Sequence, residues 1–264
     1  MIKLIVSDID GTLAEDGACS LNPELLELIL QLKEQGIYFV AASGRNVSSM
    51  ERIFEPIRDK IFYIAGNGGY VGCYGRQLFI TEYRKELAAD VIRDMRAAGF
   101  DLMIDGPGCV YTDSRNGEFL DWLLNGYRFQ VNQMEDLLTL NAPILKISGC
   151  IMRGIPEENL HYFEKKYGDR LKVTLAGMQW LDTMDPSVNK GNALKVIQES
   201  LDIRPEETMA FGDQLNDIEM LNRAYYSFSV ANGRPETKKA ARFLADSNVN
   251  QGPLKIMKLL KNER

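Results

Sequence analysis

Apolar runs and amphipathic segments alternate along the first part of the chain. The runs at 2–7, 37–43 and 61–65 are short and almost continuously apolar, which is typical of strands buried on both faces. The segment between each pair of runs has the spacing of a helix with one apolar face. Strands that alternate with helices predict a parallel sheet with helices packed on its faces.

The segment between the first two runs carries signals for both ends of a helix. Asn22 is a residue type that caps helix N-termini, and Pro23 suits the first helical position. Gly36 suits the position just past the helix end. The side chains expected to face the core recur at helical spacing and are Leu25, Leu28, Ile29 and Leu32. A shorter helix is predicted near 46–55.

The same alternation returns after residue 190, whereas the stretch between is mixed. Beyond 190 we predict, in chain order, a helix near 190–200, a strand at 207–211, a helix at 214–222, a strand at 225–230 and helices near 235–241 and 252–261. In the middle, strands near 100–105, 108–112, 144–151 and 171–184 stand among helices near 84–98, 116–124 and 156–167. We therefore predict an α/β fold: a Rossmann-like parallel-sheet core domain (1–81 and 187–264) with helices on both faces, and an inserted α+β domain (82–186).

A glycine-rich stretch follows the third apolar run. Asn67-Gly68 is a strong hairpin turn signal between two apolar segments. The glycines do not have the spacing of a dinucleotide-binding loop, and no helix is predicted to begin there. We interpret Asn67 mainly as a structural residue, with substrate contact as the alternative.

Composition narrows the possible functions. The 264 residues carry a net charge of −6 without a basic run, which disfavours nucleic-acid binding. No apolar stretch approaches the ~20 residues of a membrane span, and the N-terminus shows no signal-peptide pattern. The four cysteines are scattered and form no disulfide framework, so we expect a cytoplasmic protein.

The single histidine, His161, restricts the chemistry further. It falls in a predicted amphipathic helix, where a surface position is the simplest interpretation. A zinc site built from several histidines is impossible in this chain. An enzyme with this sequence would have to use carboxylates, lysine, hydroxyl groups and an oxygen-preferring metal.

Four short polar segments stand where such chemistry is possible. They are Asp8–Thr12, Ser43–Arg45, Asn189–Gly191 and Gly212–Asp217, three of them directly after predicted strands and one before a helix. Each alone also fits a turn or a helix cap. Together they would gather three carboxylates at one sheet edge, which is costly unless a cation neutralises them. Oxygen ligands favour Mg²⁺, and a lysine and a hydroxyl at the same edge suit a phosphate oxygen.

The motifs DxDGT, SGR, KG and GDxxND, in this order, resemble those of the haloacid dehalogenase-like (HAD-like) phosphohydrolases. The similarity is greatest to the Cof-type branch, whose α/β cap is inserted between the second and third motifs. It extends over the whole chain, including "VANGRPETKKAARFLADSNVNQGPL". The departures, Ile9, Asn189 and Gly233, remove no functional group from the motifs.

The resemblance implies a role for each motif residue. Asp8 would be the nucleophile that forms an aspartyl-phosphate, and Asp10 would be the general acid and base. Mg²⁺ would be held by Asp8, by the backbone carbonyl of Asp10 and by Asp213, with Asp217 a direct ligand or one that acts through bound water. The residues implied to bind phosphate are Thr12, Ser43, Gly44, Lys190 and Asn216.

Several functions of this kind stay open. The leading hypothesis is a Mg²⁺-dependent phosphatase for a small phosphorylated metabolite, a sugar phosphate or a similar phosphomonoester. A phosphosugar mutase with the same nucleophile and a non-catalytic metabolite-binding protein are the alternatives. The inserted domain would select the substrate, with Asp182 as the preferred contact among the candidates Asp105, Tyr111, Arg115, Trp122, Arg128 and Trp180. The sequence does not indicate the oligomeric state.

Overall fold

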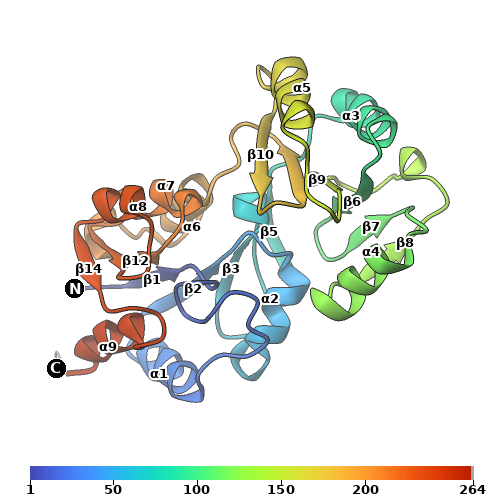
Figure 1. The fold of residues 1–264 in the computed structure, drawn as a ribbon. Coiled ribbons are helices and arrows are strands. Elements are labelled where there is room, and N and C mark those ends of the chain that lie inside the picture. The colour runs from blue at the N-terminus through green and yellow to red at the C-terminus, as the bar shows by residue number, and fades with distance from the viewer. Residues whose placement is uncertain (263–264) are drawn as a thin grey trace. The chain divides into compact units, whose positions relative to one another are not determined.

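The structure is a computed structural model that describes residues 1–262. The chain divides into two compact units (Figure 1). The core unit consists of Met1–Arg45, Met50–Phe79 and Asn189–Arg264, and the inserted unit consists of Asn46–Ser49 and Ile80–Val188.

The core unit contains an eight-stranded sheet in the order β14-β13-β12-β1-β2-β3-β4-β5. The strands are β1 (Leu4–Ser7), β2 (Tyr38–Ala42), β3 (Phe62–Ala65), β4 (Tyr70–Cys73), β5 (Arg76–Ile80), β12 (Thr208–Gly212), β13 (Tyr226–Val230) and β14 (Phe243–Ala245). Neighbours from β14 to β3 pair in parallel, which confirms the predicted parallel sheet. The pair β3 and β4 is antiparallel, so the hairpin predicted at Asn67-Gly68 extends the sheet at one edge.

Helices cover both faces of this sheet. Strand β1 is completely buried, and its side chains alternate between the two faces. Leu4 and Val6 pack in one cluster with residues of α6 (Lys190–Leu201) and α7 (Ile218–Asn222). Helices α1 (Pro23–Glu34) and α9 (Gly252–Leu259) lie on the opposite side of the sheet from α6 and α7 (Figure 1). A strand covered on both faces needs a continuous apolar run, as the sequence has there.

Helix α1 has the predicted ends and the predicted buried face. The side chain of Asn22 accepts a hydrogen bond from the backbone N–H of Glu24 at 2.9 Å. Gly36 follows the helix with φ of +84°, a conformation that glycine adopts without strain. The buried residues of the helix are the four expected: Leu25, Leu28, Ile29 and Leu32.

The inserted unit is a six-stranded sheet in the order β10-β11-β9-β6-β7-β8. The strands are β6 (Asp101–Asp105), β7 (Val110–Thr112), β8 (Val131–Gln133), β9 (Lys146–Cys150), β10 (Lys172–Ala176) and β11 (Trp180–Met184). Helices α3 (Lys85–Ala97) and α5 (Glu157–Tyr167) contribute to the main apolar cluster on one face. Helix α4 (Gly117–Asp121) packs in a smaller cluster with Met103 and Trp180 on the other face.

Two short strands and the ends of two helices differ from the sequence prediction. The helix predicted at 214–222 begins as a 3-10 turn at Leu215–Asp217 and is α-helical over Ile218–Asn222. Strands β8 and β14 were not predicted, because three partly exposed residues are too few for an apolar pattern. The helix predicted near 116–124 ends as a π-helical turn at Trp122–Gly126. Two further short helices are α8 (Pro235–Ala240), in the core unit, and α2 (Val47–Ile53). The first residues of α2, up to Ser49, belong to the inserted unit, and the rest belong to the core unit.

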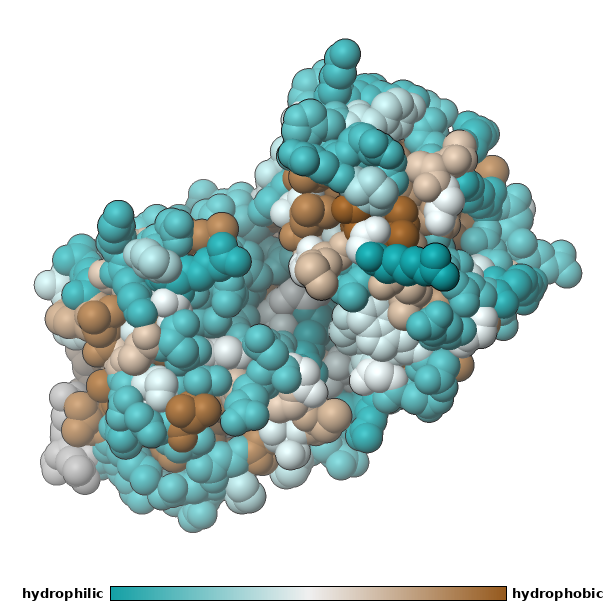
Figure 2. Space-filling model, viewed as in Figure 1, coloured by the Kyte–Doolittle hydropathy of each residue, from teal (hydrophilic) through white to brown (hydrophobic). Residues whose placement is uncertain are grey.

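The visible surface of each unit is mostly hydrophilic, with hydrophobic residues in small separate groups (Figure 2). Within residues 1–262, none of the helices combines the length and apolar character needed to cross a bilayer.

Candidate active site

The site lies where β1 and β12 end. These strands are parallel neighbours, and Ser7 stands opposite Phe211 in the register. From β1 the chain continues to β2 on one side, and from β12 it continues to β13 on the other. Open parallel sheets bind ligands at such a reversal of strand order, outside the carboxyl ends of the strands. Asp8 and Asp213, the residues that directly follow the two strands, therefore meet at this edge.

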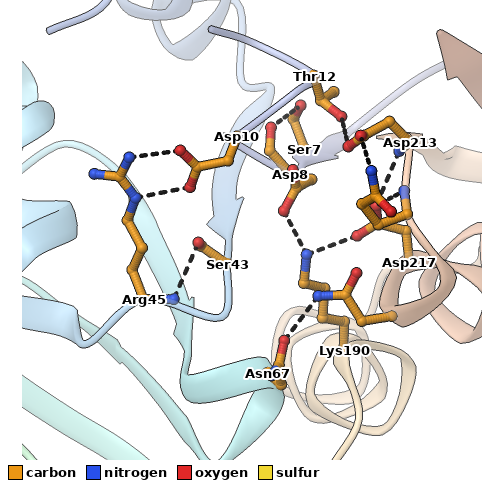
Figure 3. Close-up of polar contacts among 12 residues, drawn as sticks. Ser7, Asp8, Asp10, Thr12, Ser43, Arg45, Asn67, Lys190, Asp213 and Asp217 are labelled. Carbon is orange, nitrogen blue, oxygen red and sulfur yellow. Dashed lines mark hydrogen bonds and ion pairs between the residues drawn. The ribbon is translucent and has the colours of Figure 1, made fainter. Parts of the chain in front are cut away.

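A buried lysine joins the motifs at this edge (Figure 3). The Nζ atom of Lys190 lies 2.5 Å from Oδ1 of Asp8 and 2.6 Å from Oδ1 of Asp217. Lys190 is the first residue of α6 and has no exposed surface. The next residue is Gly191, and a Cβ at that position would lie 2.6 Å from the backbone oxygen of Glu219 in α7. The KG pair thus places a charge at the site and allows α6 to pack closely against α7.

The two carboxylates of the last motif have different surroundings. Oδ2 of Asp217 accepts hydrogen bonds from the backbone N–H groups of Asp213 and Gln214, at 2.9 and 3.0 Å. Its other oxygen is bound to Lys190, so both oxygens are already held by the protein. Asp213 accepts from the Thr12 hydroxyl at 2.8 Å and from the side chain of Gln214 at 2.9 Å.

The turn after β1 is shaped around Asp213. Gly11 has φ of +79°, and a Cβ there would lie 2.4 Å from Oδ2 of Asp213. The backbone N–H of Gly11 donates to Ala14, and that of Thr12 donates to Ile9. The predicted phosphate contact Thr12 therefore has its hydroxyl and its N–H engaged within the protein.

Burial and charge shift the pKa values of this cluster. Burial, with the nearby charge of Asp217, raises the pKa of the Asp8 carboxyl well above its usual range even though Lys190 lowers it. Burial, aided by the charge of Asp217, likewise raises the pKa of Asp213. Burial alone would lower the pKa of Lys190, but Asp217 and Asp8 outweigh it and raise this pKa above its ordinary value. The charged form of Lys190 is therefore favoured, whereas burial disfavours the ionised forms of Asp8 and Asp213.

Three carboxylates converge closely enough for a metal ion. One oxygen from each of Asp8, Asp213 and Asp217 lies within 4.8 Å of the others. All three side chains are buried, and the ligands are oxygen atoms. This donor set suits a hard divalent cation such as Mg²⁺, which would also reduce the repulsion among the three carboxylates.

Asp10 points away from this cluster and is bound by Arg45 (Figure 3). The guanidinium donates to both carboxylate oxygens, Nε to Oδ2 at 2.7 Å and Nη2 to Oδ1 at 2.5 Å. Sequence reasoning gave Arg45 no role, although it is part of the SGR motif. The one sign of a role in the sequence was its place two residues after Ser43, within the motif itself.

Ser43 and Gly44 connect to Asn216 through Asn67. The backbone N–H of Asn67 donates to the carbonyl of Ser43 at 3.0 Å. A Cβ on Gly44 would lie 3.1 Å from the side-chain oxygen of Asn67. That same oxygen accepts from Nδ2 of Asn216 at 2.8 Å. Asn67 has φ of +58°, an uncommon conformation for a residue other than glycine, so the hairpin turn contributes directly to this edge.

Two further asparagines hold the turn after β1 and were missed by sequence reasoning. Asn232 donates to the carbonyl of Gly11 at 2.7 Å, and Asn248 donates to that of Ala14 at 3.2 Å. Both lie in the stretch 230–254 that resembles the Cof-type branch, but the sequence analysis assigned them no role.

Asp182 lies in the inserted unit, within β11. Its carboxylate is buried, accepts from Ser148 at 2.7 Å and forms an ion pair with Lys146 at 3.0 Å. Lys146 also contacts Asp105 at 3.2 Å. The role of Asp182 as a substrate contact stays a prediction.

Comparison with known proteins agrees with this geometry. The model of the haloacid dehalogenase-like hydrolase family matches residues 5–257. Since this match spans nearly the whole chain, the protein belongs to the haloacid dehalogenase-like hydrolases, and the family predicted from the motifs is confirmed.

Individual relatives define the enzyme class within this family. The chain is 28% identical to the 5-amino-6-(5-phospho-D-ribitylamino)uracil phosphatase YbjI of Escherichia coli, over 99% of this chain and 97% of the relative. It is 27% identical to the HMP-PP phosphatase of Klebsiella pneumoniae, over 90% and 87%. A crystal structure from Eubacterium rectale, 30% identical, superimposes with a TM-score of 0.92 and covers 98% of this chain and 99% of that one. The predicted enzyme class, a HAD-like phosphatase, agrees with these findings.

Proposed function

We propose that the protein is a Mg²⁺-dependent phosphatase that cleaves a small phosphomonoester through an aspartyl-phosphate on Asp8. The observation that carries this proposal is the contact between Asp8 and the buried Lys190 beside Asp213. A carboxylate in this setting can attack an anionic phosphoryl group only if positive charge offsets their repulsion. Lys190 supplies part of that charge.

In the first half of the reaction, an oxygen of Asp8 attacks phosphorus. The P–O bond to the leaving group breaks, and its electron pair goes to the leaving oxygen, which takes a proton from Asp10. Lys190 and the hydroxyl of Ser43 hold the oxygens of the transferring phosphoryl group. The product is an aspartyl-phosphate and a free alcohol.

In the second half, water attacks the phosphorus of the aspartyl-phosphate. A proton passes from the water to Asp10, and the bond from phosphorus to Asp8 breaks. Its electron pair returns to the Asp8 carboxylate, and inorganic phosphate leaves. The two carboxylates of the DxD motif therefore have separate tasks, which explains why they stand close together.

The residues that would hold Mg²⁺ are Asp8, Asp213 and the backbone carbonyl of Asp10. We assign Asp217 a role through bound water and through Lys190, because its own oxygens are engaged by Lys190 and by two backbone N–H groups. When bound, the cation would neutralise charge on the phosphoryl oxygens. Thr12 would orient Asp213, and Asn216 would act together with Asn67.

We place substrate selection in the inserted unit. Among the relatives, one acts on a phosphate attached to a ribityl chain, which supports sugar phosphates and similar metabolites as the substrate class. A phosphosugar mutase remains the second candidate, because it would use the same nucleophile. The separate cysteines support our expectation of a cytoplasmic enzyme.

The test is phosphate release from a panel of phosphorylated metabolites, with Mg²⁺ and with EDTA. Asp8→Asn is the test variant. Asp202→Asn is the matched control. Asp202 is exposed, and asparagine tolerates its left-handed backbone conformation.

We expect Mg²⁺-dependent release from a few related compounds, full activity in the control variant and none with Asp8→Asn. A hexose phosphate converted to an isomer without phosphate release would favour the mutase. Tight binding of a metabolite without any turnover would contradict both enzymes.

A further inference from the structure

Arg45 and Asp10 form a two-point ion pair that the mechanism above does not explain. Asp10 also accepts from the backbone N–H of Gly17 at 3.0 Å, so three donors surround its carboxylate. Pairs of this type are strong and fix the orientation of the carboxylate as well as its position. The Asp10 side chain points toward Arg45, whereas Asp8 points toward Lys190 (Figure 3).

This pair is the more accessible part of the site. The side chains of Arg45 and Asp10 are 19% and 27% exposed, compared with 0% for Lys190 and 8% for Asp8. A proton acceptor for water must be reachable by water, and Asp10 meets this condition.

Arg45 also ties together two loops that follow adjacent strands. Its Nη2 donates to the carbonyl of Ala18 at 3.1 Å, in the loop that follows β1. Its backbone N–H donates to Oγ of Ser43, directly after β2, at 3.1 Å. The guanidinium therefore links Asp10 and the loop after β1 to the loop after β2.

We propose that Arg45 is the positioning residue for Asp10 in the cleavage of the aspartyl-phosphate. The proposal rests on the function proposed above. Arg45 does not touch the reacting atoms. It holds the Asp10 carboxylate in one orientation, so that the proton of the attacking water has a fixed acceptor while the bond between phosphorus and Asp8 breaks. Without Arg45, Asp10 loses two of its three donors and can adopt other rotamers.

An aryl substrate separates this step from the first half of the reaction. A 4-nitrophenolate leaves without a proton, so the first half then needs no help from Asp10. The second half still needs a proton acceptor for water. Loss of Arg45 should therefore slow cleavage of the aspartyl-phosphate and leave its formation from 4-nitrophenyl phosphate nearly unchanged.

The experiment is stopped-flow release of 4-nitrophenol from this substrate by the full chain with Mg²⁺. The variants are Arg45→Met, Arg45→Lys and, as a control, Arg76→Met, which removes an exposed arginine of β5. For Arg45→Met we expect a burst of about one nitrophenol per site, then a steady rate at least about tenfold below wild type. Arg45→Lys should restore part of the steady rate, and Arg76→Met should match wild type.

Three results would overturn the proposal. A slow first turnover without a burst would make Arg45 a phosphate-binding cation. A steady rate equal to or above wild type would show that Asp10 works without this restraint. Equal loss of burst and steady rate, together with a lower melting temperature and no rescue by lysine, would show a structural role only. Failure of the proposed function is distinct, because wild type would then release no more nitrophenol than Asp8→Asn.

Discussion

Each unit of the protein buries a lysine among aspartates, but the two clusters are built differently. In the core unit, Lys190 contacts Asp8 and Asp217, and Asp213 adds a third carboxylate close by. In the inserted unit, Lys146 contacts Asp105 and Asp182. The residue types are the same, and both lysines are buried, with pKa values that their aspartate partners raise above the ordinary value despite burial.

The difference lies in where the residues stand on their strands. In the inserted unit, Asp105 is directly opposite Lys146 and Asp182 is directly opposite Ser148 in the strand register. These contacts are cross-strand neighbours within a sheet, the ordinary way in which strands stabilise each other. In the core unit, the charged residues come from the turn after β1, the turn after β12 and the start of α6.

Asp8, Asp213 and Lys190 lie beyond the paired strands and are free to face a ligand, whereas Asp105 at the end of β6, Lys146 at the start of β9 and Asp182 in β11 are themselves paired sheet residues. The core cluster also has an excess of carboxylates, whose charges add to the effect of burial in raising the pKa values of Asp8 and Asp213. We therefore interpret the core cluster as catalytic. For the Lys146 cluster, a structural role competes with the predicted substrate contact of Asp182.

The largest contrast is expected between Asp8→Asn and Asp182→Asn. Loss of the nucleophile should lower kcat/KM at least about a thousandfold with the fold retained, since other site groups give only residual catalysis. Asp182→Asn should change kcat/KM less than threefold, roughly the effect of a substitution outside the chemistry, and lower the free energy of unfolding by about 1–3 kcal/mol. Steady-state kinetics and urea unfolding measure both. A large loss of kcat/KM in Asp182→Asn without a change in stability would support the predicted role of Asp182 as a substrate contact.

The two lysines provide the second contrast. Replacing either Lys190 or Lys146 by methionine leaves buried carboxylates without their partner, which should cost about 3–5 kcal/mol of unfolding free energy in the absence of metal. Only Lys190→Met should also lower kcat/KM, by on the order of a hundredfold, because it removes charge stabilisation from the transferring phosphoryl group. Activity should be compared under conditions where both variants are folded. Equal loss of kcat/KM in the two variants would contradict the distinction between a catalytic Lys190 and a structural Lys146.

Asp213→Asn should stabilise the metal-free protein. The raised pKa of Asp213 means that folding disfavours its ionised form, so at neutral pH this charge lowers stability. Removing it should raise the melting temperature by about 2–4 °C, the effect of about 1 kcal/mol in a domain of similar size. The gain should disappear as the pH falls toward about 4, where the unfolded Asp side chain also becomes protonated.

Mg²⁺ provides the control for this variant in the same thermal melt. It should raise the melting temperature of wild type and have little effect on Asp213→Asn. Equal stabilisation of both proteins by Mg²⁺ would contradict the metal site.

The smallest effect is expected at the hairpin turn. Asn216→Ala removes one hydrogen bond to Asn67, which is worth about 1 kcal/mol. We expect a change in KM of roughly fivefold, the equivalent of that energy, with kcat nearly unchanged. Asn67→Gly keeps the left-handed turn and loses the same contact, so it should match Asn216→Ala. A much larger loss in Asn67→Gly would indicate direct substrate contact.

Most of the fold was predictable because local and tertiary signals agree. Strand β1 is apolar throughout and is buried throughout, and the ends of α1 carry the capping residues that the structure uses. Strands β8 and β14 were not predictable, because neither has enough buried positions to create a pattern. Their place in the sheets depends on partners far along the chain.

The candidate site was predictable in its motifs and not in its contacts. Parallel topology brings the ends of β1 and β12 together, so Asp8 and Asp213 could be placed at one edge from the sequence. The pairing of Arg45 with Asp10 and the support from Asn232 depend on side-chain directions and long-range contacts. Arginine and asparagine are common on protein surfaces for many reasons, so their presence in a sequence does not predict these contacts.

The most direct test of the account is to locate the phosphoryl group on the protein. Wild type and Asp8→Asn are mixed with Mg²⁺ and a turned-over phosphomonoester, quenched in acid within milliseconds, digested and examined by peptide mass spectrometry. The account predicts a phosphorylated peptide that contains Asp8 in wild type and its absence in the variant. Phosphate on a different residue, or efficient turnover by Asp8→Asn, would contradict the claim that Asp8 is the nucleophile.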